Sequence, residues 1–116
     1  MTIIRIDTGP RMSEAVIHGD TIYLAGQIGA PGERVSVQTQ AALAEVDALL
    51  EQTGSDKSHL LMAQIWLADI NDFEEMNQAW DAWIAGFPAP ARATCEAKLY
   101  SPDYKVEILI TAAKAK

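Results

Sequence analysis

The chain has 116 residues, 49% of them hydrophobic, and its nine basic against sixteen acidic residues give a formal net charge of −7. This length and apolar fraction predict one domain over residues 1–116, with a core of its own. Basic residues form no patch and no apolar run approaches the roughly 20 residues that span a bilayer, so nucleic acid and membranes are disfavoured as partners.

Three short strands are predicted in the first part of the chain. Apolar and alternating segments indicate them at residues 2–6, 11–17 and 21–25, the second more weakly than the others. Residues 18–20 supply the turn before the third strand, which ends at Gly26. A Gly- and Pro-containing cluster at residues 29–32 then breaks the chain before a helix.

The first predicted helix spans residues 36–53 and is amphipathic. One face collects its apolar side chains, namely Ala42, Leu43, Val46, Leu49 and Leu50, while Gln38, Glu45 and Glu51 lie outside this face. Gly54 is expected to end the helix.

A second helix is predicted from Phe73. Apolar residues recur there at steps of three and four, and Asn71 with Glu74 has the spacing of a capping box. The helix is expected to stop at Gly86, because the prolines that follow cannot continue it.

Three further strands complete the predicted order βββ-α-β-α-ββ, at residues 60–68, 92–99 and 104–111. Two amphipathic helices among six strands fit a layered α+β sandwich, with both helices on one face of a single sheet. A tight turn near Pro102 would set Glu107 beside Glu96 or Lys98. The other face of the sheet needs cover, which favours an oligomer.

Arg92 is the first candidate for a functional residue. Strand alternation puts Arg92 and Thr94 on one side and Cys95 on the other, apolar side. The guanidinium fork of arginine matches a carboxylate in two places, so Arg92 is a plausible anchor for a small organic acid. Taken alone, it would more simply be a solvated strand charge.

Glu107 is the second candidate, since it interrupts an aliphatic strand. Partial withdrawal from water would raise the pKa of its carboxyl group, and such a group could position or deprotonate a water molecule. An exposed strand charge is an equal alternative. Cooperation with Arg92 would require another strand or a neighbouring subunit to bring the two together.

Two other residues are weaker candidates for a binding site. The missing side chain of Gly26 would let a ligand approach the backbone closely. Asn77 borders the apolar stripe of its helix and could present its amide to a pocket, although a surface role fits it as well.

The remaining reactive residue types indicate no cofactor and no metal. His18 and His59 have no partners at ligand spacing and are expected at the surface. Cys95 is expected to be a small buried hydrophobe rather than a nucleophile, and as a single cysteine it forms no internal disulfide. With no secretory signal expected at the start of the chain, we predict a cytoplasmic protein.

Together these residues resemble the RidA/YjgF/RutC family of reactive-intermediate deaminases over nearly the whole chain. The resemblance is carried by Gly26-Gln27-Ile28, by residues 67–77, by Pro90-Ala91-Arg92 and by Val106-Glu107-Ile108. The spacing from Arg92 to Glu107 is its specific part. Residues 79–83 and 104–107 are most similar to the short, RutC-like branch of the family.

The resemblance implies a chorismate-mutase-like two-layer fold, assembled as a homotrimer with clefts between subunits. It also implies hydrolysis, without a cofactor, of 2-imino and enamine acids such as 2-aminoacrylate and 2-iminopropanoate to 2-oxo acids and ammonia. Arg92 would then hold the substrate carboxylate, Gly26 would contact it through backbone, Glu107 would orient the water and Asn77 would line the cleft. The face of the last two strands that carries these charges would be free of helices and would face the subunit boundary.

Three positions depart from the archetype of the family. Met12 stands in place of a Tyr, Ala25 in place of a Ser, and Thr94 in place of a Cys. These changes would widen and dry the pocket, reducing activity on the small imine or moving the preference to a larger, more apolar one. A non-catalytic trimeric protein that senses a small 2-oxo acid is therefore the alternative, and a ribonuclease fits the acidic chain poorly.

Overall fold

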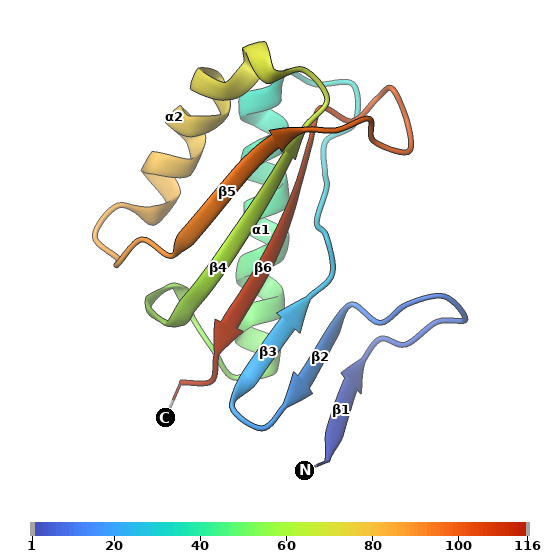
Figure 1. Cartoon of the computed structure of the whole chain (residues 1–116), viewed down its shortest axis with the longest axis vertical. Helices are drawn as coiled ribbons and strands as arrows, with labels where there is room; N and C mark the ends of the chain where they lie inside the picture. Colours follow the sequence, from blue (N-terminus) through green and yellow to red (C-terminus); the bar gives the residue numbers. More distant parts are fainter. Residues whose placement is uncertain (1, 116) are drawn as a thin grey trace.

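The computed structural model describes residues 2–115 and contains a six-stranded sheet with both long helices on one face (Figure 1). The strands lie in the order β1-β2-β3-β6-β4-β5, and their bounds are Ile3–Ile6 (β1), Ala15–His18 (β2), Thr21–Leu24 (β3), Leu60–Leu67 (β4), Ala91–Glu96 (β5) and Val106–Ala113 (β6). Only β4 and β5 pair in parallel, so the sheet is mixed. The predicted α+β class and element order are confirmed.

The pairing of the last strands in the sheet differs from the predicted one. β4 is followed by helix α2 (Phe73–Ile84) and then by β5, and this crossover lays β5 parallel to β4 at the edge of the sheet. β6 then inserts between β3 and β4. The prediction that a turn near Pro102 sets Glu107 beside Glu96 or Lys98 is therefore wrong, because Glu107 lies opposite Trp66 of β4.

Helix α1 (Val35–Thr53) buries the apolar stripe that its sequence predicts. It ends at Gly54, whose φ of 85° is the left-handed conformation expected of a glycine C-cap. Gln38 was predicted outside the stripe, and this is wrong: the side chain is fully buried. Its amide instead binds three backbone groups, of which the Asp103 carbonyl also accepts from the Gly32 N–H at 2.9 Å.

Gln38 joins the start of α1 to the β5–β6 loop. Its Nε2 donates to the carbonyls of Glu33 at 2.9 Å and Asp103 at 3.0 Å, and its Oε1 accepts from the Lys105 N–H at 2.8 Å. Replacing Gln38 with alanine removes all three hydrogen bonds and leaves the Lys105 N–H and the Glu33 carbonyl without this partner, so we expect a loss of about 2–4 kcal/mol in the free energy of unfolding. Urea denaturation measures it, with Gln40→Ala, an exposed position on the same helix, as the control. Equal stability of the two variants would contradict the role.

The predicted capping box of α2 is wrong. Residues 70–72 form a 3-10 turn before the helix, and Asp69 caps this turn by accepting from the Asn71 N–H at 2.9 Å. The N-cap of α2 itself is Asp72, whose side chain makes no capping hydrogen bond. Glu75 of α2 serves the neighbouring helix: it accepts from the Ser36 N–H at 3.1 Å, near the start of α1. Arg34 also forms a two-point ion pair with it, at 2.9 and 3.0 Å.

Glu75 should stabilise the fold in a pH-dependent way. The hydrogen bond from Arg34 is the largest cause that lowers its pKa from 4.5 to about 2. Because the folded chain then holds this proton less tightly than the unfolded chain, the stabilisation is present above pH 4.5 and is lost as the pH falls toward 2. Glu75→Gln should lower the unfolding free energy at pH 7 but not near pH 2, whereas exposed Glu74→Gln should change neither. Urea titrations at both pH values measure the difference.

The second face of the sheet carries no helix and is apolar in part. Strand register places Tyr23, Met62 and Trp66 on this face together with Cys95, and Tyr23, Met62 and Cys95 are exposed. The β5 edge is also unpaired within residues 2–115. Among those residues no helix is long and apolar enough to cross a membrane.

Candidate functional site

Arg92 lies on the helix-covered face, not on the helix-free face predicted for it. It is opposite buried Ala63 of β4, and its guanidinium lies 5.8 Å from the ring centre of Phe73 and 5.4 Å from that of Trp80. Both rings belong to α2, whose apolar stripe extends over this edge strand. Within residues 2–115 no carboxylate pairs with Arg92 and no hydrogen bond satisfies its fork. The cation is thus held by aromatic faces with its donors free for an anion.

Two buried polar atoms of the same region also have no hydrogen-bond partner among the described residues: Asn77 Oδ1 and Thr94 Oγ1. Asn77 lies on α2 between Phe73 and Trp80 in helical spacing, and Thr94 lies two residues beyond Arg92 on the same side of β5. Buried polar atoms without partners are uncommon, because desolvation costs free energy. Thr94 thus supplies a polar hydroxyl where the archetype of the family has a Cys.

Glu107 lies on the helix-free face, since it alternates with fully buried Val106 and Ile108. Burial raises the pKa of its carboxyl group above the ordinary value of 4.5. No described residue donates a hydrogen bond to it. The prediction that Glu107 is partly withdrawn from water is confirmed. A carboxyl group with a raised pKa is suited to proton transfer to or from water.

The Glu107 carboxylate occupies the space that a side chain at Gly26 would fill. A Cβ atom at Gly26 would lie 2.9 Å from Cδ of Glu107 and would overlap Oε2. A side chain at position 26 would therefore displace the Glu107 carboxylate from its present place, although it would meet no backbone within this contact. The neighbouring bridge between Gln27 and Ile108 holds β6 beside this segment, with N–H···O distances of 2.8 and 3.0 Å.

A cavity of about 410 Å³ opens beside Glu107 and Gly26. Met12 and Tyr100 contribute to its lining, and Met12 is 52% exposed. Ala25 precedes this cavity and is held by an N–H···O bond of 2.9 Å to the Glu14 carbonyl. The resemblance implied one pocket for all the candidate residues, and of these Met12, Gly26 and Glu107 line this cavity. Tyr100 was not singled out, because its position in a loop carries no periodic signal.

The two charged candidates do not meet within one chain. Arg92 and Glu107 project from opposite faces of the sheet, on strands separated by β4. The expectation that both charges share the helix-free face is thus wrong. If Arg92 and Glu107 cooperate, a second chain must still bring them together.

Other predicted assignments have mixed outcomes. Cys95 is exposed on the helix-free face, so its expected burial is wrong within the chain: Arg92 and Thr94 face the helix instead. His18 is exposed, as predicted, whereas His59 is partly buried and its Nδ1 lies 2.8 Å from Oδ1 of Asp56. Among residues 2–115 no three His, Cys, Asp or Glu side chains gather in an arrangement that could hold a metal ion.

The fold and these residues define a class: a two-layer α+β chain with a mixed sheet, a free arginine on its edge strand and a half-buried glutamate on a central strand. The family described as Endoribonuclease L-PSP matches residues 2–114. The chain is 50% identical to the RutC family protein YoaB of Escherichia coli K12 over 113 residues, covering 97% of this chain and 99% of YoaB. This chain therefore belongs to the RutC/YjgF family, that of Endoribonuclease L-PSP.

Two further relatives extend the comparison. A crystal structure of a YjgF family member from Neisseria meningitidis superposes with a TM-score of 0.96 at 46% identity, covering 100% of this chain and 98% of that one. A rat protein named 2-iminobutanoate/2-iminopropanoate deaminase is 32% identical over 104 residues, covering 83% of this chain and 74% of the rat protein.

Proposed function

We propose that this protein hydrolyses reactive 2-imino and enamine acids, of the 2-aminoacrylate and 2-iminopropanoate type, to 2-oxo acids and ammonia. The observation that carries the proposal is Arg92, a cation stacked on two rings with no acidic partner among the described residues. A guanidinium in such a setting favours a carboxylate ligand. The name of the rat relative supports the imine as the reacting group.

The proposed active site is shared between subunits of a homotrimer. Arg92 of one subunit fixes the substrate carboxylate, with Asn77 and Thr94 beside it. Glu107 of the next subunit orients water, and the Gly26 segment and Met12 and Ala25 border the reaction from that side. The separation of the two charges on opposite faces of one chain, and the uncovered apolar face, both support an assembly of this kind.

The proposed reaction needs only a modest acceleration by the protein. An enamine first takes a proton from water at its terminal carbon and becomes the imine. Water then adds to the imine carbon while Glu107 takes a proton from it and returns that proton to the nitrogen. The C–N bond of this carbinolamine breaks as its hydroxyl proton is transferred to the nitrogen, so that the 2-oxo acid forms and ammonia leaves. Free imines hydrolyse unaided, so a few kilocalories per mole from positioning and charge complementarity suffice, each 1.4 or so giving about tenfold in rate. No cofactor is required for any of these steps.

The test is a direct assay of imine decay. An amino-acid oxidase generates 2-iminopropanoate in the presence of catalase, and its disappearance is timed with and without the purified protein. We expect a faster decay that scales with protein concentration. An unchanged decay would contradict the proposal.

A second candidate is a non-catalytic sensor of a small 2-oxo acid. The replacement of a phenolic residue by Met12, which is half exposed beside Glu107, favours it by removing one proton donor. Thermal stabilisation by 2-oxobutanoate without any acceleration of imine decay would support this candidate instead.

Ribonuclease activity, which the family description names, ranks third. RNA binding needs a concentrated basic surface, and this chain carries a formal charge of −7.

A further inference from the structure

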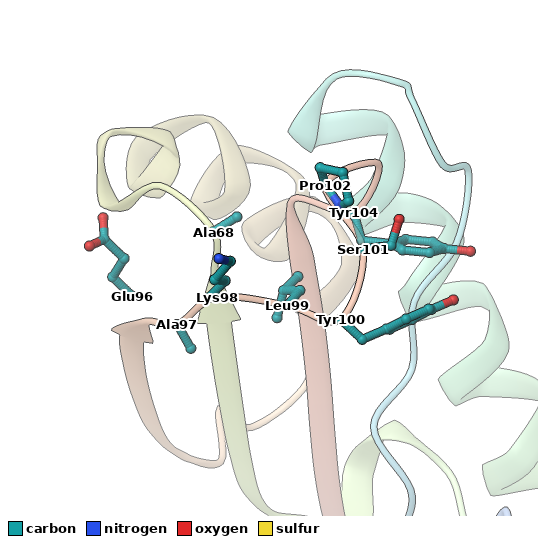
Figure 2. Close-up of a pocket in the computed structure, with 9 residues that line it drawn as sticks. All are labelled: Ala68, Glu96, Ala97, Lys98, Leu99, Tyr100, Ser101, Pro102 and Tyr104. Atoms are coloured by element: carbon teal, nitrogen blue, oxygen red, sulfur yellow. The ribbon is translucent and has the colours of Figure 1, made fainter.

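Tyr100 lies at the junction of two cavities. It lines the cavity of about 410 Å³ beside Glu107, and it also lines a larger one of about 820 Å³ beneath the β5–β6 loop. The larger cavity has an apolar and aromatic wall that includes Leu99, Pro102 and Tyr104 (Figure 2). A ligand held at Glu107 could therefore extend past the Tyr100 ring into a second space.

The Tyr100 ring is held in place although it is 78% exposed. Its centre lies 5.4 Å from that of Tyr104, with a tilt of 34° between the rings. Figure 2 shows both rings extending to the same side of the loop, with Glu96 at the far end of the cavity. The hydrogen bond with Tyr104 is the largest cause that raises the pKa of Tyr100 above its ordinary value of 10.0. An exposed aromatic that is fixed and uncharged can bind apolar ligand surface with little loss of side-chain entropy.

The charges around the smaller cavity exclude one class of ligand. Glu14 and Glu45 line it together with Glu107, and no basic side chain lines it. A substrate with an acidic side chain would meet like charges there. Met12 adds a flexible apolar surface to the lining of the same cavity.

We propose that Tyr100 determines side-chain specificity, and that the site takes 2-imino acids with a large uncharged side chain, aromatic ones best. The ring forms the wall against which that side chain packs between the two cavities. This inference rests on the proposed function for its reaction, but the packing itself concerns binding alone.

The experiment compares the wild type with Tyr100→Ala and Tyr100→Phe on imines generated from alanine, phenylalanine and glutamate. We expect kcat/KM for the phenylalanine-derived imine to exceed that for the alanine-derived one by about tenfold or more, with the glutamate-derived imine poorest. Tyr100→Phe keeps the ring and should keep the preference. Tyr100→Ala should bring the ratio close to one, mainly by loss on the aromatic imine; since the side chain is exposed, its removal should leave the fold intact.

A parallel binding measurement separates this inference from the proposed function. Calorimetry with phenylpyruvate and pyruvate, the corresponding 2-oxo acids, should give tighter binding of phenylpyruvate to the wild type and to Tyr100→Phe, but not to Tyr100→Ala. If no imine decays faster, the proposed function fails while this binding preference still tests Tyr100. Equal or better use of the smallest ligands by the wild type, or an unchanged preference in Tyr100→Ala, would overturn the inference.

Discussion

Replacing Arg92 with alanine should lower kcat/KM for imine hydrolysis by about a hundredfold or more. Removing one member of a desolvated charge pair costs about 2–5 kcal/mol, and the substrate carboxylate would lose both its partner and its orientation. Arg92→Lys keeps the charge but loses the fork, so we expect an intermediate loss of about tenfold. Steady-state kinetics on 2-iminopropanoate measures both.

The matched control for Arg92 is Arg5→Ala, an exposed strand arginine on β1, the far edge of the sheet. It should leave kcat/KM unchanged. Melting curves of the Arg92 variants show whether loss of the contacts with Phe73 and Trp80 affects the fold itself. Activity of the alanine variant equal to that of the wild type would remove the carboxylate anchor from the mechanism.

Glu107→Gln should produce the second large effect, a loss of about 10²–10⁴ in kcat/KM. Glutamine has nearly the same shape but cannot accept a proton from water. Because burial raises the pKa of Glu107 above 4.5, the wild-type activity should rise with pH along a limb displaced above that value, as the carboxyl group ionises. The variant should lack this limb, whereas exposed Glu51→Gln should keep it.

The same burial has a consequence for stability. With its pKa raised in the folded chain, Glu107 binds its proton more tightly there than in the unfolded chain. The free energy of unfolding should therefore fall as the pH rises above 4.5, and Glu107→Gln should be free of this component. Urea midpoints of the wild type and of Glu107→Gln at pH 4.5 and pH 7 give the comparison. If stability falls equally in both proteins, the Glu107 carboxyl group is solvated in the folded chain and the prediction is wrong.

Local patterns predicted most of the elements. The stripe on α1, the glycine stop at Gly54 and the order of strands and helices follow from residue periodicity and from turn chemistry, which act over a few positions. Strand ends shifted by several residues in places, most at β2 and β5, where alternation continues into the loops.

Long-range pairing was harder to predict. A strand, a helix and a strand in succession at residues 60–96 is the signature of parallel neighbours, and it could have placed β5 beside β4 and not beside β6. The apolar side of an alternating strand usually faces the core, but at this edge of the sheet it does not. Ala93 and Cys95 face away from the helices, while Arg92 packs its cation on aromatic rings of α2.

Gln38 and Tyr100 were missed for a different reason. A polar residue near a helix start is ordinarily solvated, and only the return of the β5–β6 loop gives Gln38 two of its three partners, Asp103 and Lys105. Tyr100 lies in that same loop, and the residues that line a cavity with it come from segments distant in sequence. Neither environment is encoded in the neighbouring residues.

A complementation experiment with two inactive variants tests the shared site most directly. Arg92→Ala and Glu107→Gln chains are mixed in equal amounts, unfolded and refolded together. If each site takes Arg92 from one subunit and Glu107 from the next, random assembly restores both groups in about one quarter of the sites, and activity should return to about that fraction of the wild type. If the mixture stays as inactive as its components while refolded wild type recovers, the site is not shared and the account is contradicted.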